Sequence, residues 1–151
     1  MAHWLNQQDR DRLEAAIRAA EFETSGEIVV ALKAHVKGDI YHTAKTFFDQ
    51  HKLTRTADRN GVLLLLAYKD RRIALLGDEG INNRVPPDFW EGTVAKMTAR
   101  FREQDYIGGL EVGIRDIGQQ LKRFFPHRED DVNELPDDIM DEDAETEHGT
   151  V

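Results

Sequence analysis

The chain has 151 residues and no cysteine. This absence excludes disulfides, Cys-ligated zinc and iron–sulfur centres, and every enzyme with a cysteine nucleophile, thiol phosphatases included. Long apolar runs are also missing. The longest, Val62–Tyr68, is far shorter than the roughly 20 residues that a membrane-spanning helix needs. The first residues show no basic segment followed by an apolar one, so we expect no signal peptide, no membrane partner and a cytoplasmic location.

Basic residues are absent from the last part of the chain. Residues 129–151 contain 11 acidic side chains and no Lys or Arg, whereas residues 1–128 hold the other 18 acidic residues and all 20 basic ones. The net charge of −9 is therefore a property of the tail, and the body carries +2. A nearly neutral body lacks the clustered basic surface of nucleic-acid-binding proteins, so we expect no nucleic-acid partner. We expect one domain over residues 1–128 and an acidic tail over 129–151, largely disordered after about residue 140, with its apolar residues, Ile139 and Met140 among them, as candidates for docking on the body.

Hydrophobic periodicity predicts the elements. In chain order they are a helix capped by Asn6, a strand at 27–32, a helix capped by Asp39, strands at 62–68 and 71–77, a helix after Pro86 with the stripe Trp90, Val94, Met97 and Phe101, and a helix over Ile107–Phe124. The strands are apolar at nearly every position, which indicates cover on both faces. We therefore expect an α/β fold, a three-layer α/β/α sandwich with a small mixed sheet in the order α-β-α-β-β-α-α. The first two strands should be parallel, and the last two an antiparallel hairpin.

This topology brings polar segments from distant parts of the chain to one edge of the sheet. The parallel strands begin there, and the hairpin returns the third strand to the same edge. We expect Ser25 and Glu27 to meet residues 58–61 and 77–80. The last helix should end nearby, with Phe124–Pro126 and residues 130–134.

Carboxylate and amide oxygens at a loop-rich edge are typical ligands of Ca²⁺ and, with more water retained, of Mg²⁺. Asp78 is the leading candidate, because Gly77 and Gly80 on either side free the backbone to fold around an ion. The alternative is that Asp78 and Asn60 cap local turns and that Glu27 is solvated or paired with an arginine. The candidate metal ligands are Asp78, Glu79, Asn60, Asp58, Glu27 and Asp131, and Arg59 is the candidate for holding a substrate phosphate.

Several of these segments together resemble the TPM-domain family. They are Thr24–Val30, Arg59–Leu65, Ile73–Ile81, and Phe101–Tyr106 with Gly109 and Leu110. The resemblance runs from about Leu5 to Ile117 and implies an α/β/α sandwich. It also implies a metal site, because some members bind calcium at loops bordering the sheet, and more weakly a phosphatase, because a plant relative has been assigned acid phosphatase activity.

Two departures from the family pattern stand out. Many members carry Asp before Asn-Gly, where this chain has Arg59, so one ligand is replaced by a cation. Most members also have a secretion signal and a membrane anchor, which we do not find here. The tail looks like a short, cytoplasmic branch of the family.

We expect a non-catalytic Ca²⁺-binding module. The sequence has no P-loop, no His-Glu-x-x-His and no Asp-x-Asp at a strand end, and these absences favour binding over catalysis. Two alternatives stay open, namely a metal-dependent phosphoester hydrolase and an interaction protein that acts through its acidic tail. A protein partner is left open in each case.

Overall fold

The computed structural model describes residues 5–127 and 139–141. Asn6 caps helix α1 and Asp39 caps α2, as predicted, each through a side-chain oxygen that accepts a backbone N–H of the first turn. In chain order the elements are α1 (Gln7–Phe22), β1 (Glu27–Lys33), α2 (Ile40–Gln50), β2 (Gly61–Ala67), β3 (Arg72–Gly77), α3 (Glu79–Asn82), α4 (Glu91–Arg102), α5 (Tyr106–Phe124) and β4 (Met140–Asp141).

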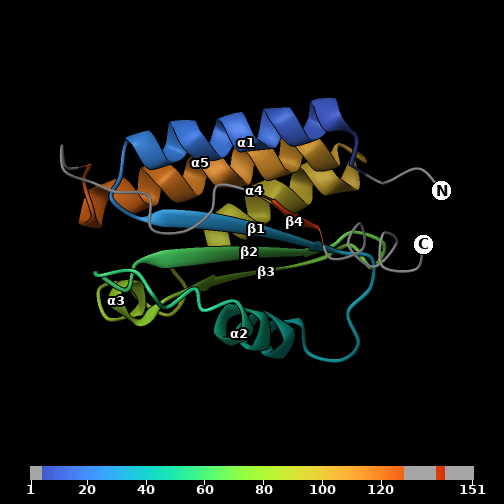
Figure 1. The fold of residues 1–151 in the computed structure, drawn as a ribbon. Coiled ribbons are helices and arrows are strands. Elements are labelled where there is room, and N and C mark those ends of the chain that lie inside the picture. The colour runs from blue at the N-terminus through green and yellow to red at the C-terminus, as the bar shows by residue number, and fades with distance from the viewer. Residues whose placement is uncertain (1–4, 128–138, 142–151) are drawn as a thin grey trace.

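The sheet is mixed, with the strand order β3-β2-β1-β4. Strand β1 runs parallel to β2, with Glu27 opposite Gly61, and β2 pairs antiparallel with β3, with Val62 opposite Gly77. These pairings confirm the predicted topology. Consequently the beginnings of β1 and β2 and the end of β3 share one edge (Figure 1).

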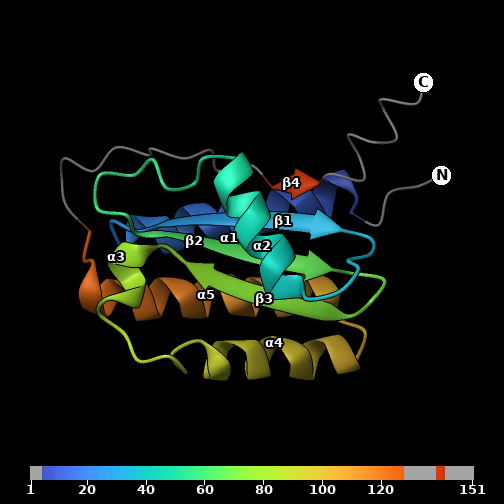
Figure 2. The same cartoon turned by 90° about the horizontal axis from the view of Figure 1, so that it is seen from below.

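Helices cover both faces of the sheet, as expected for three layers. Helices α1, α4 and α5 lie on one face and α2 on the other (Figures 1 and 2). Successive β1 residues therefore belong to different cores, Ile28 and Val30 to the α1–α4–α5 side and Val29 to the α2 side. Burial on both sides explains why the strands are apolar at nearly every position, since each buried aliphatic side chain contributes roughly 1.5–3 kcal/mol. Among the described residues, no helix is both long enough and apolar enough to cross a membrane.

Part of the predicted tail belongs to this core. Met140 and Asp141 pair in parallel with Ala31 and Leu32 as β4, a strand that the periodicity did not predict. Ile139 is 2% exposed and packs in the α1–α4–α5 core, where its carbonyl accepts a hydrogen bond of 2.7 Å from Arg10 Nη2. The sheet therefore gains a fourth strand from a segment separated in sequence from the rest.

Helix α4 only partly follows its predicted stripe. Met97 and Phe101 are buried as expected, together with Thr93, but Trp90 and Val94 are only partly buried. The reason is the position of the helix: α4 lies out beyond β3, so only its inner residues face the sheet (Figure 2).

Glycines on α5 allow α4 to pack closely. A Cβ atom at Gly113 would lie 2.2 Å from the Met97 sulfur, and one at Gly109 would lie 2.5 Å from the Phe101 ring. Glycine costs a helix roughly 1 kcal/mol relative to alanine. Here that cost is offset by a helix–helix contact closer than any side chain permits.

Candidate functional site

The polar segments converge at the predicted sheet edge. The Glu27 N–H donates to the Asn60 carbonyl at 3.3 Å, and the Gly80 N–H donates to the Arg59 carbonyl at 2.9 Å. The Asp78 N–H extends the ladder of β2 and β3 by one bond of 2.9 Å to the Gly61 carbonyl. The prediction that residues 58–61 and 77–80 meet is confirmed.

The end of α5 reaches the same edge, also as predicted. The Ser25 N–H donates to the Phe125 carbonyl at 2.9 Å, the Thr24 hydroxyl donates to the same carbonyl, and Thr24 forms an antiparallel bridge with Pro126. Beside these contacts is a hollow of about 200 Å³, lined by Ser25, Asp58, Arg84, Phe124, Phe125 and Pro126.

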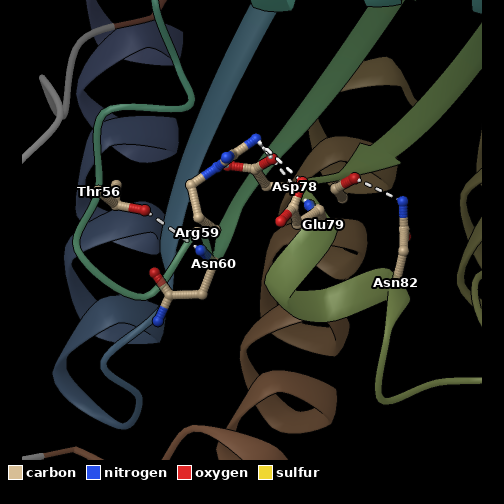
Figure 3. A network of polar contacts seen from close by, with 7 residues as sticks. Thr56, Arg59, Asn60, Asp78, Glu79 and Asn82 are labelled. Atoms are coloured by element: carbon tan, nitrogen blue, oxygen red, sulfur yellow. Dashed lines mark hydrogen bonds and ion pairs between the residues drawn. The ribbon is translucent and has the colours of Figure 1, made fainter.

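An ion pair between Arg59 and Asp78 dominates the edge (Figure 3). Arg59 Nε donates to Asp78 Oδ2 at 2.8 Å, and Nη2 donates to Oδ1 at 2.9 Å. The Asp78 side chain is 4% exposed and the Arg59 side chain 40%. The hydrogen bond with Asp78 raises the pKa of Arg59 above its ordinary value. The buried carboxylate is thus neutralised by a guanidinium that itself reaches solvent.

The backbone of Arg59 is in the left-handed region, with φ of 51°. A non-glycine residue adopts this conformation at a cost of roughly 1–2 kcal/mol, which the surrounding structure must offset. Two bonds do so here: the Arg59 carbonyl accepts the Gly80 N–H, and the side chain binds Asp78. The pair therefore rests on a locally strained backbone.

Asp78 also caps the short helix α3. Its Oδ1 accepts the Glu79 N–H at 2.7 Å, so the capping alternative for Asp78 is confirmed. The Gly77 carbonyl accepts Asn82 Nδ2 at 3.0 Å (Figure 3). Gly80 packs so closely that a Cβ atom there would lie 2.2 Å from the Asp58 carbonyl oxygen.

The other predicted residues lie around this pair. The Asn60 N–H donates to Thr56 Oγ1 at 3.2 Å, and Asn60 Nδ2 is 3.5 Å from Ser25 Oγ. The Glu79 side chain is 66% exposed, with its carboxylate 3.7 Å from Arg59 Nη2. Glu27 is only 4% exposed, so the alternative of a solvated side chain is wrong. Asp131 and residues 130–134 lie outside the described residues.

These oxygens have the chemistry that a hard cation requires. Their arrangement, however, holds the Arg59 guanidinium against both oxygens of Asp78, in the place a cation would take. Within residues 5–127 and 139–141, no cluster of three or more Asp, Glu or His side chains is arranged to hold a metal ion. A cation therefore fits the donor types of this edge only if Arg59 withdraws.

Two residues at the site were not predicted from the sequence. The Arg84 guanidinium lies 4.6 Å from the centre of the Phe125 ring and donates to the Phe124 carbonyl at 3.1 Å. Thr56 is 3% exposed and holds the Asn60 backbone. Arg84 acts through residues distant in sequence and Thr56 through a local turn, and neither is part of a motif.

Comparison with known proteins gives one family match. The model described as the TPM domain matches residues 1–120. No curated protein matches the chain.

Solved structures resemble the chain over most of its length. BA42 protein from the psychrophilic bacterium Bizionia argentinensis is 35% identical with a TM-score of 0.88, and the match covers 93% of this chain and 97% of that one. The N-terminal domain of a protein from P. gingivalis is 20% identical, with a TM-score of 0.66 and 82% of each chain covered. The N-terminal domain of cg2496 protein from Corynebacterium glutamicum is 14% identical, with a TM-score of 0.62 and 78% and 74% covered.

Proposed function

Because the chain belongs to the TPM-domain family, we propose that it is a non-catalytic binding module whose ligand site is the sheet edge around Arg59 and Asp78. The proposed ligand is a divalent cation, Ca²⁺ first and Mg²⁺ second. The observation that carries the proposal is a buried carboxylate, Asp78, at an edge where oxygen donors from three segments converge.

The Arg59 side chain determines how a cation would bind. The Asp78 side chain is buried, and a buried charge needs a partner of opposite charge to offset its desolvation. Arg59 supplies that partner, and its 40% exposure gives the guanidinium a path into solvent. A cation would therefore exchange with the guanidinium at Asp78, with Asn60 and Glu79 as candidates for further oxygen donors. This competition predicts weak binding in the natural chain.

The hydrogen bonds at the edge support binding over catalysis. Both oxygens of Asp78 already accept strong donors, so the carboxylate is not poised as a nucleophile or general base. The neighbouring hydroxyl of Ser25 lies near the Asn60 amide at 3.5 Å. That amide is not a base, so it does not activate the hydroxyl.

The test is a titration of the ¹⁵N-labelled chain with CaCl₂ and then MgCl₂, followed through the amide signals of residues 58–61 and 77–82. We expect saturable shifts confined to these segments, tighter binding in Arg59→Gln, and loss of binding in Asp78→Asn. Arg84→Gln is the matched control, since Arg84 lies at the same edge but donates to a backbone carbonyl and faces an aromatic ring. It should leave the affinity unchanged.

Two results would overturn the proposal. Absence of shifts in both the natural chain and Arg59→Gln would refute the cation site. Metal-dependent hydrolysis of an aryl phosphate that disappears in Asp78→Asn would replace the binding module with a phosphoester hydrolase. If Asp78→Asn loses its dispersed amide spectrum, Glu79→Gln serves instead, because that side chain is exposed.

A further inference from the structure

A second surface of the molecule, along the side of β3 rather than at its end, has the features of a peptide groove. It is a hollow of about 540 Å³ between the edge strand β3, the start of α2 and the outer side of α4. Its walls include Tyr41, Leu75, Trp90, Val94, Ala95 and Ala99. Tyr41 is one of the two large hydrophobic side chains that stand exposed among the described residues, at 50%. The groove is therefore open to solvent and has an apolar wall, and Thr98 and the charged Glu91 and Arg102 also line it.

Strand β3 has unpaired backbone groups along this groove. It is an edge strand, with β2 on one side and no strand of the described chain on the other. The Asp78 N–H bonds to Gly61, so by alternation Leu76 and Ala74 also bond toward β2, and Leu75 and Ile73 direct their N–H and C=O groups outward. A free edge of this kind is a template for one more strand.

Helix α4 covers the position that such a strand would occupy. A further strand would lie about 4.8 Å beyond β3. In Figure 2, α4 extends beyond β3 over that same position, on the face that it shares with α1 and α5. Ala95 and Ala99 are small, exposed and directed into the groove, which leaves room beneath the helix. Helix α4 would therefore cover one face of a strand added to β3, and the described chain does not supply that strand.

Trp90, which lines the groove, also has an unsatisfied polar atom. Its Nε1–H is buried and has no hydrogen-bond partner among the described residues. A buried donor left unpaired is destabilising. The Trp90 indole signal therefore reports on the wall of the groove.

The charged residues at the two ends of the groove indicate which charges a bound peptide should carry. Glu91 lines one end and Arg102 the other, about 16 Å apart along α4 at 1.5 Å per residue. Neither side chain forms an ion pair with another residue in the described part of the protein. A strand of about five to seven residues spans this length. Its matching charges are a basic residue beside Glu91 and an acidic residue beside Arg102.

Helix α4 runs back along β3 (Figures 1 and 2). We take the occupant to pair antiparallel with β3, as β2 does on the other side of that strand. A strand antiparallel to β3 runs in the same direction as α4, so its N-terminal end meets Glu91 and its C-terminal end meets Arg102. A second copy of the chain fits poorly. Antiparallel pairing of β3 with its own copy about a two-fold axis places both α4 helices over the same position on the same face.

We propose that the groove binds an extended peptide of another protein by strand addition to β3, with a basic N-terminal end, apolar alternate residues and an acidic C-terminal end. Main-chain hydrogen bonds to Ile73 and Leu75 provide the binding energy common to all such peptides, and the charged ends set the direction. This proposal does not rest on the cation site, which lies at the end of the strands rather than along their side.

The probe is the peptide acetyl-Lys-Thr-Val-Thr-Val-Thr-Asp-amide at millimolar concentration, added to the ¹⁵N-labelled full chain. We expect saturable shifts of the Ile73 and Leu75 amides and the Trp90 indole signal. Those two amides should exchange with solvent at least about tenfold more slowly, because they become hydrogen-bonded. Two N-methylated versions of the peptide each block one set of alternate amides. Their affinities must differ, because only one set of amides faces β3.

Variants locate the site. Ala99→Gln fills the groove from an exposed helix position and should weaken binding about tenfold, the equivalent of about 1.4 kcal/mol. Ala19→Gln, at an exposed position of α1, is the matched control and should bind normally. Arg102→Glu should shift preference toward the same peptide with Lys in place of its final Asp.

Three outcomes would overturn the proposal. The first is absence of shifts at Ile73 and Leu75 at millimolar peptide. The second is equal binding of the two N-methylated peptides, which would show that main-chain pairing is not used. The third is a concentration-dependent dimer, measured by sedimentation and removed by Ala99→Gln, which would assign the groove to a second copy of the chain.

Discussion

Arg59, two positions before β2, and Asp78, directly after β3, are joined by two parallel hydrogen bonds of 2.8 and 2.9 Å. The planar guanidinium matches the carboxylate, a geometry stronger than a single bond. The pair thus fastens two chain segments at the open end of the hairpin, and its contribution depends on both partners.

The coupling between these two residues can be measured by a double-mutant cycle. Asp78→Asn should lower the free energy of unfolding by about 1–3 kcal/mol, since it weakens the pairing with Arg59 and the cap of α3. Arg59→Gln should cost a similar amount, because it leaves a buried carboxylate without its cation. The double variant should lose about 1–2 kcal/mol less than the sum. Denaturant unfolding of all four proteins supplies the numbers, and strict additivity would contradict a coupled pair.

A methyl group at Gly80 should disrupt the same edge. In Gly80→Ala the new Cβ would lie 2.2 Å from the Asp58 carbonyl oxygen and 2.6 Å from that of Arg59, and backbone atoms cannot rotate away. We expect a loss of about 2 kcal/mol or more. The control is Gly92→Ala in α4, where no atom lies within 4 Å. There, alanine should stabilise by roughly 0.5–1 kcal/mol. Thermal unfolding compares the two, and equal effects would rule out the close approach at Gly80.

Asp70, in the turn between β2 and β3, should make the free energy of unfolding decrease at acid pH. Asp70 accepts the Val36 N–H at 2.7 Å and lies 2.6 Å from His35 Nδ1. These contacts lower the pKa of Asp70 below its ordinary value. A lowered pKa means that the stabilisation is complete above the unfolded-state value, about 3.9, and disappears as the pH falls through the lower folded-state value.

Asp70→Asn removes this titration. The natural chain should therefore be more stable than Asp70→Asn at pH 6, and the difference should shrink below about pH 4. Urea unfolding at a series of pH values measures it. A difference that stays constant down to pH 2 would show that Asp70 contributes no charge-dependent stability.

Ile139 should stabilise the body although residues 125–138 separate it in sequence from α5. It is 2% exposed in the α1–α4–α5 core, so Ile139→Ala should cost about 2–4 kcal/mol. The neighbouring Met140 is only partly buried, and Met140→Ala should cost clearly less. Unfolding followed by Trp fluorescence and circular dichroism tests both variants. An Ile139→Ala variant as stable as the natural chain would mean that the segment does not dock in solution.

The layers and the site's location were predictable, because they depend on signals carried within short segments. Asn6 and Asp39 predict the starts of two helices because their side chains cap backbone N–H groups. The continuous apolar strands indicate cover on both faces. Parallel pairing of the first two strands then places Glu27 beside Asn60. Each step needs only periodicity and topology.

The contacts inside the site were not predictable in the same way. Whether Asp78 binds a cation, caps a turn or pairs with Arg59 depends on the left-handed backbone at Arg59, which no local signal reveals. Strand β4 has only two residues and no period to detect. Trp90 and Val94 match a core-facing stripe, but the displacement of α4 beyond β3 leaves them lining a groove.

Gly109 and Gly113 set how closely α4 approaches α5, although neither glycine lines the groove. A single alanine at either position would shift α4 relative to β3 without altering any residue that a bound strand would touch. If the groove binds a peptide as proposed, residues inside the helical layer would therefore tune its selectivity. Chains with identical groove residues can differ in the partners they accept, and comparing lining residues alone would not detect the change.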